Sequence, residues 1–118
     1  MSFREFECTS RVDGSKYHCY FIFLQTAISL RHSDTVDARF QVNGQRITVA
    51  LPHVAFVEYI NRRGAVITDP HAAGIAASCL KEYLESGGAL EDITVPLERV
   101  LELAEQAQPT SDTLIAKQ

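Results

Sequence analysis

The chain is 118 residues long, which suffices for one domain with a hydrophobic core of its own. Its hydrophobic content of 46% and charged content of 22% are ordinary for a soluble globular protein, and its net charge of −4 disfavours nucleic acid as a partner. The longest apolar run, residues 19–24, is too short to cross a bilayer, no signal-peptide pattern is present, and the three cysteines have no paired spacing. We therefore expect a cytoplasmic protein that makes no membrane contact.

The first two strands are expected at residues 3–12 and 17–24. Residues 3–12 alternate between apolar and polar positions, and residues 17–24 are rich in aromatic and β-branched residues. An Asp-Gly-Ser-Lys turn at 13–16 separates the two strands, and a two-residue loop within it would place Cys8 opposite Cys19. The second strand is apolar on both faces, so we expect it in the interior of the sheet. The inner face of the first strand is expected to carry Phe6, Cys8, Ser10 and Val12.

Residues 25–31 fit either a continuation of the second strand or a helical turn. We favour a strand that runs to residue 30, because its alternation then matches that of the strand that follows. Thr26, Ile28 and Leu30 would face inward, and a bulge near Gln25 would join the two halves of this long strand.

Residues 36–51 carry the clearest pattern in the chain, a hairpin around Asn43-Gly44. This dipeptide suits a type I′ turn, in which both central residues have positive φ. The expected opposed pairs are Phe40 with Ile47, Ala38 with Val49, and Val36 with Leu51. These apolar side chains would share one face of the sheet, which the rest of the chain must cover. The other face would carry Asp37, Arg39, Arg46 and Thr48.

Helical periodicity begins after the hairpin. Pro52 suits the first turn of a helix that Gly64 would end. Asp69 is expected to cap a second, alanine-rich helix that stops at Ser86, and a third helix is expected from about Pro96 to Gln108. The apolar stripe of the first of these helices is Val54, Val57 and Ile60.

These elements predict an α+β fold: an N-terminal four-stranded antiparallel β-meander, covered on one face by two to three C-terminal helices. The expected strands are 3–12, 17–30, 36–43 and 46–51, and residues 92–95 could add a short extra strand. We expect a single domain over residues 1–109 and a flexible C-terminal tail over residues 110–118.

No catalytic or metal-binding motif is recognisable in the chain. HExxH, CxxC and HxH are absent, and no glycine-rich loop leads from a strand into a helix. We therefore expect no catalytic residue, no metal and no cofactor, and we expect the cysteines to pack in the core as inert thiols. Whether His53, Asp69 and His71 converge stays open, although a capping role explains Asp69 and a first-turn position predicts a solvated His71.

Binding residues are expected among polar and aromatic side chains near the sheet. Arg39 and Arg46 would project from the polar face of the hairpin, and Tyr20 could lie near them. Glu5 and Glu7 could come close to His18 and Tyr20 across the first two strands. The candidate binding residues are His18, Tyr20, Arg39, Arg46 and His53.

We predict a small, non-catalytic binding or regulatory module that forms a homodimer and can take a protein partner. The dimer interface would be the sheet or the alanine-rich second helix. The reason is that the second strand, residues 17–24, carries more large apolar surface than one layer of helices covers. The alternative is a small-molecule-binding domain or small enzyme, with a polar site between sheet and helices that uses His18, Tyr20, Arg39 and His53.

Overall fold

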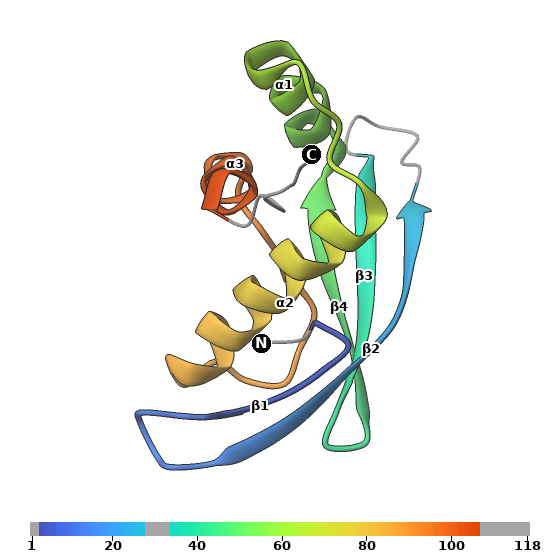
Figure 1. The fold of residues 1–118 in the computed structure, drawn as a ribbon. Helices are drawn as coiled ribbons and strands as arrows, with labels where there is room; N and C mark the ends of the chain where they lie inside the picture. The colour runs from blue at the N-terminus through green and yellow to red at the C-terminus, as the bar shows by residue number, and fades with distance from the viewer. Residues whose placement is uncertain (1–2, 28–33, 107–118) are drawn as a thin grey trace, which may run out of the picture.

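The computed structural model describes residues 3–27 and 34–106, which form a five-stranded sheet and three helices (Figure 1). The sheet order is β1-β2-β3-β4-β5, with antiparallel pairing throughout except for the parallel pair β4–β5. The elements are β1 (Glu5–Thr9), β2 (Lys16–Ala27), β3 (Thr35–Val42), β4 (Gln45–Pro52), α1 (His53–Arg63), α2 (Asp69–Glu85), β5 (Ile93–Thr94) and α3 (Leu97–Gln106). The α+β class and the antiparallel meander are confirmed, and β5 adds a short fifth strand. None of the described helices is long and apolar enough to cross a membrane.

The β3–β4 hairpin has the expected register. Asn43 and Gly44 have φ values of 50° and 87°, the positive values that a type I′ turn requires. Phe40 lies opposite Ile47, and both side chains are fully buried. The pairs Ala38–Val49 and Val36–Leu51 are also present. The two strands therefore present one continuous apolar face to the helices.

The β1–β2 hairpin differs from the prediction. Phe6, not Cys8, lies opposite Cys19, and Cys8 lies opposite Tyr17. The connection is longer than two residues, because Ser10 and Ser15 still pair through a backbone hydrogen bond of 2.8 Å. The two cysteines remain on the same face as diagonal neighbours.

Side chains inside this connection explain its length. The Ser10 hydroxyl accepts a hydrogen bond from the Val12 amide at 3.1 Å, and the Asp13 carboxylate accepts one from the Ser15 amide at 2.9 Å. Gly14 takes a positive φ of 77°. The loop thus holds Val12 away from the sheet, so its side chain is 75% exposed and not on the inner face as expected.

The long strand β2 is extended through Ala27, as favoured, but its bulge lies between Phe21 and Phe23 and not near Gln25. Phe21 pairs with Phe40 on the apolar face, whereas Phe23 pairs with Arg39 on the other. Thr26 pairs with Val36 on the apolar side of the sheet, as predicted, but its side chain is exposed. The predicted residues Ile28 and Leu30 lie outside the described residues.

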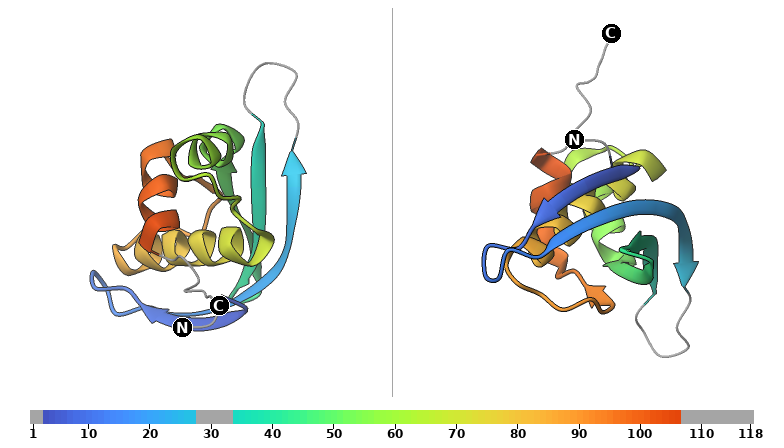
Figure 2. Two further views of the ribbon diagram at one scale, coloured as in Figure 1. Left: turned by 45° about the horizontal axis from the view of Figure 1, so that its top comes forward. Right: turned by 90° about the horizontal axis from the view of Figure 1, so that it is seen from below.

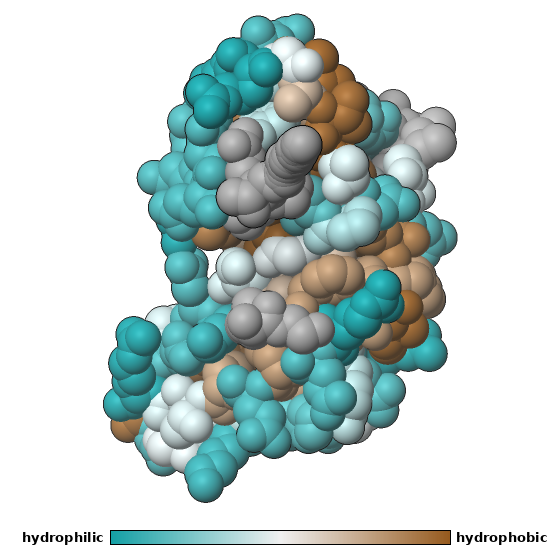
Figure 3. Space-filling model, viewed as in Figure 1, coloured by the Kyte–Doolittle hydropathy of each residue, from teal (hydrophilic) through white to brown (hydrophobic). Residues whose placement is uncertain are grey.

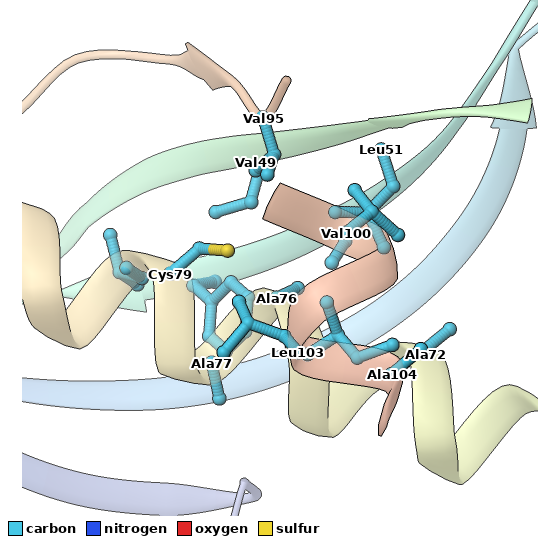
Figure 4. Packing of buried hydrophobic residues seen from close by; sticks show 14 of the residues in the cluster. Val49, Leu51, Ala72, Ala76, Ala77, Cys79, Val95, Val100, Leu103 and Ala104 are labelled. Atoms are coloured by element: carbon cyan, nitrogen blue, oxygen red, sulfur yellow. The ribbon is translucent and has the colours of Figure 1, made fainter. Parts of the chain in front are cut away.

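The helices cover one face of the sheet (Figure 2). α2 lies across β1, β2 and β4, and α3 packs against α1, α2 and β4. Figure 4 shows the core between β4, α2 and α3, where Val49 and Leu51 approach Ala76 and Val100. Small side chains along α2 let the helix lie close to its neighbours. The buried residues of this helix are mostly small or aliphatic and include Ala72, Ala73, Ala76, Cys79 and Leu80.

The start of α2 is capped one residue earlier than predicted. The hydroxyl of Thr68, not the carboxylate of Asp69, accepts a hydrogen bond from the His71 amide at 3.4 Å. Asp69 instead occupies the first turn, where its negative charge lies near the positive end of the helix dipole.

The apolar stripe of α1 faces solvent. Val54, Val57 and Ile60 are 56%, 45% and 45% exposed, and Figure 3 shows hydrophobic surface on α1 at the top of the view. The buried residues of this helix are Ala55 and Tyr59, on the opposite side. α1 extends beyond the end of the sheet, so α3 and the end of β4 cover a single side of it.

Replacement of a central residue of the apolar face tests this packing. We expect Phe40→Ala to lower the free energy of unfolding by about 3–5 kcal/mol, because it removes a fully buried ring from a closed core. The neighbouring variant Gln41→Ala, at an exposed position, should change it by less than about 0.5 kcal/mol. Urea denaturation of both variants measures the difference, and equal losses would contradict the assignment of the two faces.

Candidate functional site

No described helix covers the second side of the sheet, which we call the outer face (Figure 2). Its side chains alternate with the buried ones along β1 to β4, so the same register that builds the core also builds this surface. Four of the five predicted binding residues lie here. The outer face carries Glu5, Glu7, His18, Tyr20, Phe23, Arg39, Gln41, Arg46 and Thr48.

His18 is held between two carboxylates on the outer face. Its Nε2 lies 2.7 Å from Glu5 Oε2, and its Nδ1 lies 3.8 Å from Glu7 Oε2. The ring also stacks on Tyr20, with 4.6 Å between ring centroids and 21° between the planes. The expected approach of Glu5 and Glu7 to this pair is thus present. The arrangement fixes two flat rings in a half-exposed position, which suits contact with another molecule.

Arg39 and Arg46 extend the surface across β3 and β4. The Arg39 guanidinium carbon lies 5.9 Å from the centre of the Phe23 ring, within cation–π range. The Nε of Arg39 is buried and has no hydrogen-bond partner among residues 3–27 and 34–106. Arg46 lies opposite Gln41, which in turn lies opposite Tyr20. The outer face therefore combines aromatic rings with two cations.

His53, the fifth predicted binding residue, lies apart from the other four. It begins α1 and stacks on Phe56, with 6.2 Å between ring centroids. Together with Asp69 it lines a groove of about 270 Å³ beside Leu24 and Thr26 of β2. Of the five predicted binding residues, four therefore lie together on the outer face, and His53 lies on the side of the sheet that the helices cover.

His71 is buried, which corrects the expectation that it is solvated. Its side chain is 8% exposed, its Nε2 donates a 3.0 Å hydrogen bond to the Ala104 carbonyl, and its ring meets Tyr59 edge to face. Burial lowers the pKa of His71, and the hydrogen bond to Ala104 opposes this shift. His71 therefore links α2 to α3 and does not converge with Asp69 on a metal site.

In the part of the chain that the structure describes, no group of three or more His, Cys, Asp or Glu side chains is arranged so that it could hold a metal ion. Cys8, Cys19 and Cys79 are all buried free thiols. Burial raises the pKa of each thiol, and it reaches about 12 for Cys19 and Cys79. These cysteines are protonated at neutral pH and make poor nucleophiles.

A second groove, of about 580 Å³, was not predicted from the sequence. It lies between the end of α2, β5 and the start of α3. Arg99 within it is paired with Glu82 and with Glu102 at 3.1 Å, and these hydrogen bonds raise the pKa of Arg99 further. Its remaining lining includes Cys79, Tyr83, Ile93 and Pro96. No motif marks these residues, because they meet only through tertiary packing.

The chain matches no protein-family model, and neither a curated protein nor a solved structure is similar enough to count as a match. The geometry of the described residues is therefore the basis for any functional inference. That geometry brings together aromatic and charged side chains on an open sheet, without an activated nucleophile.

The pH dependence of stability tests the burial of His71. A lowered folded-state pKa means that the unfolded chain takes up the proton first. The neutral ring therefore contributes its full stability above its ordinary pKa of 6.5, and this contribution is lost as the pH falls below that value. Between about pH 7.5 and pH 5.5, the free energy of unfolding measured with urea should fall less for His71→Gln than for the wild type. Identical pH dependences of the free energy of unfolding for His71→Gln and the wild type would refute the assignment.

Proposed function

We propose that the chain is a non-catalytic binding module that self-associates and presents the outer face of its sheet to a protein partner. The observation that carries the proposal is the outer face itself, where the stacked His18–Tyr20 pair and the Phe23–Arg39 pair lie on a sheet side that none of the described helices covers. Aromatic and arginine side chains are enriched at protein interfaces and dominate their binding energies.

Catalysis finds little support among the described residues. The candidate base His18 is shared between two carboxylates, and its sequence neighbour Cys19 is buried on the opposite face. An acid–base or nucleophilic mechanism needs such groups to meet at one reacting atom.

We also propose a cytoplasmic location. The support for it is that all three cysteines are free thiols, which suits a reducing compartment.

Self-association is supported by the surface that the fold leaves uncovered. The predicted alternative interface, the alanine-rich α2, is used inside the molecule, where it packs against the sheet and α3. Of the two predicted interfaces, the sheet is the one that the described helices leave accessible to a second copy. Exposed large apolar residues on it include Tyr20 and Phe23.

A small-molecule site is the second candidate. The groove between α2 and α3 supports it, because Arg99 and Tyr83 there offer polar contacts beside the apolar Ile93. Arg99 is already neutralised by Glu82 and Glu102, so an anionic ligand would have to displace a carboxylate.

A thermal-shift screen distinguishes the two candidates. We expect metabolites and metal ions to leave the melting temperature within about 1 °C of the free protein. A ligand at 100 times its Kd stabilises a protein by about 2.7 kcal/mol, which raises the melting temperature by several degrees. A shift of that size from one ligand class, abolished in Arg99→Ala, would favour the small-molecule site.

Light scattering tests self-association. Gel filtration with light scattering at high micromolar concentration should give a mass near twice the 13.1 kDa of one chain. The dilution series should show a concentration-dependent approach to the monomer mass. A monomer at every concentration would remove self-association from the proposal.

A further inference from the structure

The two halves of β2 have different neighbours. Residues Lys16–Tyr20 pair with β1 on one side, and residues Cys19–Ala27 pair with β3 on the other. Beyond the hydrogen bond from the Phe21 amide to the Arg4 carbonyl, no described strand pairs with β2 on the β1 side. Figures 1 and 2 show this end of β2 at the outer boundary of the sheet. Half of the backbone N–H and C=O groups of residues 22–27 therefore face away from β3.

The edge at β1 is protected against pairing with another chain. β1 is only five residues long and places the charged side chains Glu5 and Glu7 beside its edge. Just beyond it, the Arg11 amide donates a 2.9 Å hydrogen bond to the Glu85 carbonyl at the end of α2. Short length and charge are the usual means by which proteins block edge-to-edge association.

The edge at β4 is also covered. β5 pairs with its second half, at Val49 and Ala50. In its first half, Asp92 accepts a 2.9 Å hydrogen bond from the Thr48 amide, and Gln45 donates a 2.8 Å hydrogen bond to the Leu90 carbonyl. Backbone and side chains of the 90–94 segment thus occupy this edge.

The end of β2 carries none of these devices among the described residues. The segment from Phe23 to Ala27 contains no charged residue and no proline. Phe23 is 39% exposed, and Gln25 and Thr26 are exposed as well. On the helical side, Leu24 and Thr26 line the groove of about 270 Å³, which opens beside this edge. The bulge between Phe21 and Phe23 lies before this segment, and the edge from Phe23 to Ala27 is extended and uncharged, which suits it to pairing with another strand.

We propose that the free edge of β2 pairs with β2 of a second copy of this chain. The two strands run antiparallel about a two-fold axis near Gln25, and the two five-stranded sheets join into one of ten strands. This inference rests on the self-association in the proposed function and assigns its geometry.

A second copy fits this edge because antiparallel pairing of a strand with itself is self-complementary about a two-fold axis. Each copy offers the same unpaired groups to the other, and no like charges meet across the axis. Leu24 lies opposite Thr26 of the partner subunit, so both grooves are bordered by the new strand pair. The outer faces of the two copies become one continuous surface.

Cross-linking tests the position of the axis. Gln25→Cys in the full chain should give a covalent dimer with a short bis-maleimide, because the axis brings position 25 of both copies together. Gln41→Cys is the control, since position 41 is also exposed on the outer face but lies away from the edge. The native cysteines are buried, so the wild type should give no dimer band.

A charge pair tests the same contact without cross-linking. Gln25→Lys and Gln25→Glu should each raise the dimer dissociation constant roughly fivefold or more, because each places like charges opposite one another. An equimolar mixture of the two variants should recover the wild-type affinity as a heterodimer. Gln106→Lys, at an exposed position at the end of α3 and away from the sheet's outer face, should leave the dissociation constant unchanged, and circular dichroism should show an unaltered fold for every variant.

The outcomes separate the geometry from self-association itself. A wild-type dimer that neither cross-links at position 25 nor responds to the charged variants overturns edge pairing and leaves the self-associating module intact. A wild type that is monomeric throughout overturns both. Cross-linking at position 25 together with rescue in the mixture supports the proposed axis.

Discussion

The two-residue turn between β3 and β4 is the constraint on which the rest of the structure depends. Asn43 and Gly44 adopt positive φ, and this turn fixes which residues of the two strands oppose each other. A change of one residue in this register would exchange Phe40 for Arg39 on the apolar face. The helices would then lie on charged side chains, and the outer face would lose its arginines. The β3–β4 register therefore determines both the hydrophobic core and the candidate site.

Local signals made the fold largely predictable from the sequence. The Asn-Gly turn, the strand alternation and the helix-ending glycine at Gly64 each depend on residues close in the chain. The β1–β2 connection was harder to predict, because the hydroxyl of Ser10 and the carboxylate of Asp13 lengthen the loop through their own hydrogen bonds. The bulge beyond Phe21 likewise depends on how β2 pairs with its neighbours.

The candidate site was predictable only where strand alternation defines it. His18, Tyr20, Arg39 and Arg46 share the outer face because period-two patterning places them there. Helical periodicity identifies an apolar stripe but not which neighbour covers it, so α1 turns its valines to solvent. His71 and the Arg99 groove arise from contacts between segments distant in sequence, which no local pattern encodes.

The sparse anchoring of α1 has a consequence for how the molecule moves. Ala55 and Tyr59 are its buried side chains, and its outer stripe is already in water. Detachment of this helix therefore exposes far less new apolar area than separation of α2 from the sheet. Amide hydrogens of α1 will exchange with solvent through local unfolding of this helix, whereas those of β3 and β4 will exchange only when the whole domain unfolds.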